Sequence, residues 1–316
     1  MWKSLTIHFT EVSTKHFHSH SAVSYCAFSR DGYLLIAGCE DGSIRVWQIG
    51  TGNRLLTAKG HKGPVKVCVF SADAKLFASG SKDCTVRVWN TDQGTCLHVL
   101  KGHTQSVESV CFSRNSKLLA SGSYDNKAIL WDQELGGLVK IFATHRKVIK
   151  ACAFSKDEQY LATGSWDCTV LLWDVKTLKR LQSLKGHSAK VSCVAFSGIG
   201  MLASGSWDNT VRVWDPEKGV LIFVLEGHKG PLMTLAFSLD AILLVTAAHD
   251  RKVCIWDCED GTCKKVLQGQ LDIVTCCQFS SLDTIMIAGI SAIDQTMIEP
   301  AVSLAETKPL THENDT

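Results

Sequence analysis

The sequence has few of the features that mark membrane, secreted or metal-binding proteins. Apolar runs such as Ala241–Val245 are far shorter than the about 20 residues that cross a bilayer. The first residues, MWKSLTIHFTEV, lack the apolar stretch of a signal peptide. The 14 cysteines include no C-x-x-C pair, so neither a zinc site nor a disulfide framework is supported. We therefore expect a soluble intracellular protein with reduced thiols, in the cytoplasm, the nucleus or both.

An excess of one charge and the common catalytic motifs are also lacking. The 33 Lys and Arg residues nearly balance the 31 Asp and Glu residues, for a formal net charge of +2. This balance argues against direct binding to nucleic acid or to a membrane through bulk charge. No P-loop, G-x-G-x-x-G fingerprint or G-x-S-x-G elbow occurs, so we expect no enzyme and no cofactor. The alternating His16, His18 and His20 could hold a metal on one strand face, but an exposed strand explains them better.

What the chain has in abundance is an internal repeat. Residues Gly186–Asp215, GHSAKVSCVAFSGIGMLASGSWDNTVRVWD, open on Gly-His, pass through two alternating apolar segments and close on Trp-Asp. The closing tryptophan recurs at steps of 42, 42, 42, 41 and 42 residues, at Trp47, Trp89, Trp131, Trp173, Trp214 and Trp256. A period of about 40–45 residues with four short strand patterns predicts the blades of a β-propeller.

The signature GH…SGSWD…VWD resembles the WD repeat family over nearly the whole chain. The resemblance implies an all-β fold in which four-stranded antiparallel blades close into one ring. Seven first-strand patterns, beginning with VSYCAF, and seven second-strand patterns, beginning with YLLIAG, predict a single seven-bladed β-propeller. Because a blade cannot bury its faces alone, we expect residues 21–300 to form one domain.

The two ends of the chain depart from the repeat. Within residues 1–20, Ser13–Phe17 lies where later repeats have their outermost strand, so we expect this segment to close the ring on the last blade. A flexible leader is the alternative. The last blade is degenerate, because Pro300 stands where the tryptophan belongs, and proline ends a strand or stays at an edge. Residues 301–316 are polar and patternless, which predicts a disordered C-terminal tail.

Five repeats carry a histidine, a hydroxyl, an aspartate and a tryptophan at matching places. Where Ser19 replaces the histidine, Ala37 replaces the hydroxyl, and where Gln270 replaces it, Ala288 does so. An unpaired buried imidazole or hydroxyl costs about 1–3 kcal/mol, which explains why the two are lost together. The family resemblance implies hydrogen-bonded tetrads. These are His61, Ser79, Asp83, Trp89; His103, Ser121, Asp125, Trp131; His145, Thr163, Asp167, Trp173; His187, Ser204, Asp208, Trp214; and His228, Thr246, Asp250, Trp256.

The same residue types make up the Ser-His-Asp triad of hydrolases. Five equal copies, each with its own tryptophan and none on a strained nucleophile turn, favour a structural role instead. We therefore expect no catalytic residues.

The residue just before the turn aspartate is a candidate for partner binding. Repeats one to six have Glu40, Lys82, Tyr124, Trp166, Trp207 and His249 there. The family resemblance implies that this position faces the narrow top rim, so the last four would form an aromatic arc on consecutive blades. Clustered exposed aromatic residues indicate recognition. The alternative is that these side chains pack against neighbouring loops.

A second candidate ring follows the first apolar residue of each inner strand. The resemblance places these residues around the upper mouth of the channel: Ser24, Lys66, Glu108, Lys150, Ser192, Met233 and Thr275. Lys66, Glu108 and Lys150 alternate in sign on adjacent blades and could orient a partner. The alternative is a trio that neutralises itself and contributes little stability.

Together these features predict a non-catalytic scaffold or adaptor that binds protein or peptide partners through its aromatic top face, as a monomeric propeller within a larger complex. The alternative function is a substrate receptor of a ubiquitin ligase or a subunit of a chromatin-type complex. Such receptors typically carry W-D-x-R after the third strand. Here the corresponding residues read WQIG, WNTD, WDQE, WDVK, WDPE and WDCE, without that arginine.

Overall fold

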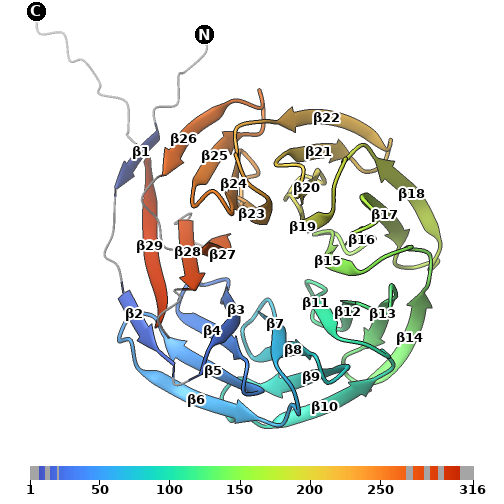
Figure 1. Ribbon diagram of the computed structural model, residues 1–316, viewed down its shortest axis with the longest axis vertical. Helices are drawn as coiled ribbons and strands as arrows, with labels where there is room; N and C mark the ends of the chain where they lie inside the picture. The colour runs from blue at the N-terminus through green and yellow to red at the C-terminus, as the bar shows by residue number, and fades with distance from the viewer. Residues whose placement is uncertain are drawn as a thin grey trace, which may run out of the picture.

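The computed structural model describes residues 7–10, 15–19, 21–267, 273–280, 285–290 and 295–306. Every regular element among them is a β-strand, and none of these residues forms a helix long and apolar enough to cross a membrane. The strands build six four-stranded antiparallel sheets and a seventh sheet that joins the two ends of the chain. The sheets stand around a central axis as the blades of a β-propeller (Figure 1).

Each of the six complete blades uses four consecutive strands, and the first strand of each is innermost (Figure 1). Blades 1 to 3 consist of β3 (Val23–Phe28), β4 (Leu34–Cys39), β5 (Ser43–Gln48) and β6 (Arg54–Lys59); β7 (Val65–Phe70), β8 (Leu76–Ser81), β9 (Thr85–Asn90) and β10 (Cys96–Lys101); and β11 (Val107–Phe112), β12 (Leu118–Ser123), β13 (Ala128–Asp132) and β14 (Gly137–Phe142). Blades 4 to 6 consist of β15 (Ile149–Phe154), β16 (Tyr160–Ser165), β17 (Thr169–Asp174) and β18 (Arg180–Lys185); β19 (Val191–Phe196), β20 (Leu202–Ser206), β21 (Val211–Asp215) and β22 (Val220–Leu225); and β23 (Leu232–Phe237), β24 (Leu243–Ala248), β25 (Val253–Asp257) and β26 (Cys263–Leu267).

The hydrophobic core lies between neighbouring blades. Ile36 and Val46 of blade 1 pack in one cluster with Val65, Phe77 and Trp89 of blade 2. The second and third strands are apolar on both faces because each sheet is covered by a neighbour on either side. A blade therefore completes its core only when the next blade is in place.

The seventh sheet contains β27 (Ile273–Phe279), β28 (Ile285–Ile290) and β29 (Gln295–Glu306), with β1 (Ile7–Thr10) and β2 (Lys15–His18) along the far side of β29. β2 pairs with the start of β29, with Lys15 opposite Ile298, and β1 pairs with its end. The expected closing segment, Ser13–Phe17, therefore overlaps β2, while Ser13 and Thr14 lie outside the described residues.

Of the two outcomes expected for Pro300, ending the strand or staying at an edge, the first is wrong. β29 continues through this residue to Glu306, past the boundary expected at residue 300. Pro300 lies opposite Met286 beside a register shift, where the ladder skips one residue. A bulge of this kind tolerates the missing N–H of proline. Residues 301–306 thus belong to a paired strand rather than to a disordered tail, and residues 307–316 lie outside the described residues.

The five tetrads form continuous hydrogen-bond chains. In blade 5 the indole N–H of Trp214 donates to Ser204 Oγ at 2.9 Å, and this hydroxyl lies 2.9 Å from His187 Nε2. His187 Nδ1 lies 2.8 Å from Asp208 Oδ2. Equivalent bonds occur in the other four sets, at distances of 2.8–3.2 Å. Because an indole can only donate and a carboxylate can only accept, the chain runs from tryptophan to aspartate.

Burial decides the charge state of these tetrads. Loss of solvation lowers the pKa of His61, His187 and His228, against an opposing effect of their aspartates, so the imidazoles are neutral near pH 7. Burial alone would raise the pKa of Asp83, but hydrogen bonds from the Thr85 hydroxyl, the Lys62 N–H and His61 outweigh it and lower the pKa to about 2. The tetrads of His61, His187 and His228 therefore pair a neutral imidazole with a carboxylate.

The aspartate of each tetrad also holds the turn at the top of its blade. In blade 5, Asp208 Oδ2 accepts the N–H of Ser188 at 3.0 Å, and its Oδ1 accepts the N–H of Thr210 at 3.0 Å. The next residue, Asn209, has φ of 69°, a left-handed conformation that asparagine tolerates well. These bonds fix the direction of the residue before the aspartate, which is the candidate binding position.

Blade 1 replaces the tetrad with an arginine that the sequence analysis did not single out. The buried guanidinium of Arg45 donates to the hydroxyl of Ser19, which stands in the place of the histidine, and to Asp41 Oδ2 at 3.2 Å. The turn aspartate thus keeps a donor although His and the hydroxyl are both missing. Ala37 and Ala288, at the two hydroxyl positions, are fully buried, whereas Gln270 lies outside the described residues.

Replacing a tetrad histidine should destabilise the whole ring. We expect His187→Ala to lower the free energy of unfolding by about 1–3 kcal/mol, because it leaves the proton of the buried Ser204 hydroxyl without an acceptor and removes the imidazole donor from Asp208. Urea unfolding followed by circular dichroism measures the change. His249→Ala, at an exposed histidine, is the matched control and should cost far less. Equal stability of the two variants would contradict the structural role of the tetrad.

The tetrads should also make stability depend on pH. The pKa values of His61, His187 and His228 are lower in the folded protein than the ordinary about 6.5, so the unfolded chain binds more protons as the pH falls. We expect the free energy of unfolding to decrease from about pH 7 to about pH 5, and further below about pH 4 as aspartates such as Asp83 lose their advantage. Urea unfolding across this range provides the test. A flat profile between pH 7 and pH 5 would show that the imidazoles are not held neutral.

Candidate functional site

Three of the four side chains of the predicted aromatic arc, Tyr124, Trp166 and Trp207, lie next to one another on the top face, the face that carries the aspartate turns. The Tyr124 and Trp166 ring centroids are 5.4 Å apart in an edge-to-face arrangement, and those of Trp166 and Trp207 are 6.3 Å apart. Tyr124 is 38% exposed, Trp207 is 42% exposed and Trp166 is half-buried. His249 is exposed as well. The first three rings form one continuous aromatic surface across blades 3 to 5.

Backbone hydrogen bonds hold these residues in equivalent positions. The N–H groups of Tyr124, Trp166 and Trp207 each donate at 2.9 Å to a carbonyl in the loop before the first strand of the same blade, at Ser106, Val148 and Lys190 respectively. The rings therefore project from a fixed backbone and not from a loose loop. Such preorganisation lowers the entropy cost of binding a partner.

Lys190 adds a feature that the sequence analysis missed. Its Nζ lies 4.1 Å from the ring centroid of Trp166 and 4.4 Å from that of Trp207. Both distances are well within the about 6 Å range of a cation–π interaction. One ammonium group therefore joins the two indoles. The equivalent residues of the two preceding blades are Ser106 and Val148, so a lysine does not recur at this position and the repeat pattern does not single out Lys190.

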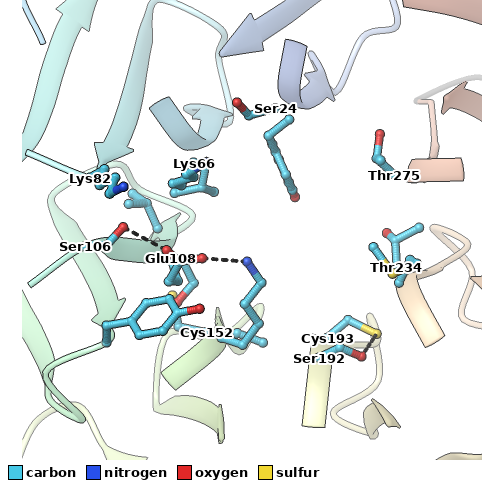
Figure 2. A pocket seen from close by; sticks show the side chains of 18 of the residues that line it. Ser24, Lys66, Lys82, Ser106, Glu108, Cys152, Ser192, Cys193, Thr234 and Thr275 are labelled. Atoms are coloured by element: carbon cyan, nitrogen blue, oxygen red, sulfur yellow. Dashed lines mark hydrogen bonds and ion pairs between the residues drawn. The ribbon is translucent and has the colours of Figure 1, made fainter. Parts of the chain in front are cut away.

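The second predicted ring surrounds the mouth of the central channel. A cavity of about 960 Å³ is lined by all seven of its members, and Figure 2 shows Ser24, Lys66, Glu108, Ser192 and Thr275 around the opening. Lys82, Glu40 and Tyr124 line the same cavity. Because Tyr124 also contacts Trp166, the channel mouth and the aromatic surface are continuous.

The charged members of this ring pair differently from the expected trio. Lys150 Nζ lies 2.8 Å from Glu108 Oε2, and Ser106 donates to the other oxygen of Glu108 at 2.8 Å (Figure 2). Lys66 instead contacts Glu40 of blade 1, with Nζ 3.1 Å from Oε1. The hydrogen bond and charge of Lys66 lower the pKa of Glu40. Both ion pairs join adjacent blades. Lys66, Glu108 and Lys150, whose charges alternate in the sequence, therefore belong to two separate ion pairs rather than to one trio.

The tetrads offer little for catalysis. The five hydroxyl side chains are 0% exposed, and each accepts an indole N–H. A substrate cannot reach an oxygen enclosed in this way. Among the described residues, no three His, Cys, Asp or Glu side chains come together as metal ligands. The open chemistry of the molecule is instead the aromatic and charged surface at its top.

Comparison with known proteins agrees with this geometry. A search of curated proteins found no match. The family described as WD domain, G-beta repeat matches six segments of the chain, residues 11–48, 52–90, 94–132, 136–174, 178–215 and 219–257. These segments cover well over half of the 316 residues and contain all five tetrads. The chain therefore belongs to the WD repeat family of β-propellers, whose members act as protein-binding scaffolds.

Proposed function

We propose that this protein is a non-catalytic scaffold or adaptor that holds protein or peptide partners on its top face. The observation that carries the proposal is the exposed surface of Tyr124, Trp166 and Trp207, with ring centroids 5.4 and 6.3 Å apart. Rigid aromatic side chains of this kind supply much of the binding energy at protein interfaces. Membership of the WD repeat family supports the same class of function.

The two tryptophans of the arc, Trp166 and Trp207, are not needed by the tetrads. The strand-ending tryptophans are all buried, for example Trp89 at 1% and Trp214 at 3% exposed. Trp207, in contrast, leaves 42% of its surface in solvent. The alternative, that these side chains pack against neighbouring loops, has less support, because Tyr124, Trp166 and Trp207 contact one another and Lys190 contacts both indoles. Lys66, Glu108, Lys150 and His249 border this surface and would set the orientation of a partner.

We further propose that the ring has seven blades and that β2 closes it. The first family segment, residues 11–48, begins with β2, just as the second, residues 52–90, begins with β6. β6 is the outermost strand of the preceding blade, so β2 takes the same place in the seventh sheet, where it pairs with β29. The ends of the chain are then tied into one sheet, which leaves no open seam.

A substrate receptor of a ubiquitin ligase or a subunit of a chromatin-type complex is the second candidate function. It has less support, because none of the six third strands is followed by the arginine of a W-D-x-R motif. The segments GPVKVC, DCTVRVW and SCVAFSGIGMLASGSWD resemble WD repeat-containing protein 38, a resemblance that names no partner. Free thiols at all 14 cysteines suit a cytoplasmic or nuclear location.

Removal of the Trp166 and Trp207 indoles tests the binding surface. We expect the Trp166→Ala/Trp207→Ala double variant to melt within about 3 °C of the wild type, because half-exposed side chains contribute little to the core. It should lose its main partners in affinity purification with quantitative mass spectrometry, at about 2 kcal/mol or more for each anchor. Leu135→Ala/Ile199→Ala, at residues that are 82% and 72% exposed, is the matched control. A folded double variant that keeps every partner would move the binding surface elsewhere.

Deletion of residues 1–20 tests ring closure. This change removes β1 and β2 and leaves one edge of β29 unpaired, so we expect a lower melting temperature and self-association. Differential scanning fluorimetry and size-exclusion chromatography with light scattering measure the two effects. Deleting residues 307–316, which spares β29, should do much less. An unchanged melting curve with a monomeric truncated protein would rule out closure by β2.

A further inference from the structure

We propose that the aromatic surface binds an acidic peptide segment that also carries an apolar side chain, and that Lys190 selects this chemistry. The inference rests on the proposed function, because it names the partner class of the same site. The observation behind it is that the position over the Trp166 and Trp207 rings, which a partner's cation would take, is already filled by the ammonium of Lys190.

Exposed aromatic clusters usually attract cations, because the ring face carries partial negative charge. Here Lys190 supplies that cation from within the chain. The Lys190 carbonyl accepts the N–H of Trp207 at 2.9 Å. The backbone of Lys190 is therefore hydrogen-bonded to one of the two tryptophans that its ammonium group contacts. A partner's lysine or arginine would have to displace this charge or approach it closely, and both are unfavourable.

The charges around the indoles favour an acidic partner. Arg146 and Lys147 are exposed in the loop next to Trp166, where the Arg146 N–H donates to Asp167 at 3.0 Å and the Lys147 carbonyl accepts the hydroxyl of Ser165 at 3.1 Å. Within the described part of the chain, the side chains of Arg146, Lys147 and Lys190 form no ion pair. Lys190 over the two indoles, and Arg146 and Lys147 in the loop beside Trp166, are thus three positively charged residues without an ion-pair partner, and carboxylates of a partner would pair with them.

The acidic groups of the same region are already occupied. Asp167 and Asp208 bind the histidine and a backbone N–H of their own tetrads. Glu108 is 8% exposed and binds both Lys150 and Ser106. Asp167 and Asp208 keep their negative charge, but their side chains are only 11% and 8% exposed, so the exposed charge next to the indoles is mainly positive, although the whole chain is nearly neutral. The apolar side chain of the partner would lie against the open faces of Tyr124 and Trp207, which are 38% and 42% exposed.

Defined peptides test this selectivity on the full chain. The probes are a fluorescein-labelled glutamate-rich peptide with one central phenylalanine and the same peptide with every glutamate replaced by lysine. We expect the acidic peptide to bind with an affinity that falls as salt rises, and Lys190→Glu to weaken it by at least about tenfold in fluorescence anisotropy. Lys101→Glu carries the same charge change at an exposed residue of β10 and should alter binding by no more than about twofold.

A gain of function provides the second arm. Lys190→Ala empties the cation position, so tetramethylammonium chloride should quench the tryptophan fluorescence of this variant and not that of the wild type. Equal or tighter binding of the lysine peptide to the wild type would overturn the proposal, as would a folded Lys190→Glu variant with undiminished binding of the acidic peptide. Circular dichroism melting of each variant verifies its fold.

Failure of this inference is distinguishable from failure of the proposed function. If the Trp166→Ala/Trp207→Ala variant retains its partners, the top face is not the docking surface and both proposals fall. If that variant loses its partners but the wild type prefers the lysine peptide, the docking surface stands and only the acidic partner class is wrong.

Discussion

The hydrogen-bond chain from a buried indole to a turn carboxylate is the constraint on which the rest of this molecule depends. Its hydroxyl and imidazole groups lie where water cannot replace a missing partner, so these side chains must be present together or be replaced together. His187, Ser204, Asp208 and Trp214 tie the third strand of blade 5 to the second strand and to the turn above them. The burial that makes these hydrogen bonds necessary also lowers the pKa of His187 and so keeps its imidazole neutral.

Blade 1 shows what the constraint demands when the histidine is absent. Arg45 donates both to Ser19 and to Asp41, so the carboxylate is still satisfied from inside the blade. The turn above it has the same backbone form, with Gly42 at φ of 79° where other blades have Asn209 or Cys168 at 69° and 68°. The blades thus have in common a turn aspartate that accepts a hydrogen bond from within its blade, whichever side chain donates it.

The hydrogen-bonded turns hold the residues of the top face in fixed positions. Because each aspartate holds its turn by several hydrogen bonds, the residue before it projects from nearly the same place in every blade, and its identity alone changes the surface. Lys66–Glu40 and Lys150–Glu108 then link adjacent blades around the channel mouth. In blades 4 and 5 the shared position carries two tryptophans, and Lys190 bridges them. A scaffold with repeated geometry thus acquires a local chemistry through a few residues that are not repeated.

The sequence by itself determined the features that recur with the period. The 42-residue step of Trp89 and Trp131 located the strands and the tetrads, because the alternation of buried and exposed positions and the pairing of buried polar groups are local demands that each repeat must meet. It also identified the arc positions of Trp166 and Trp207, since they hold the same place in their repeats. Only the tertiary structure decided the contacts that join one blade to another. Three such features are the cation–π contacts of Lys190 with two indoles, the ion pair of Lys66 with Glu40, and the continuation of β29 past Pro300. Each depends on which segments of the chain lie side by side in space, and a periodic sequence pattern does not encode these contacts.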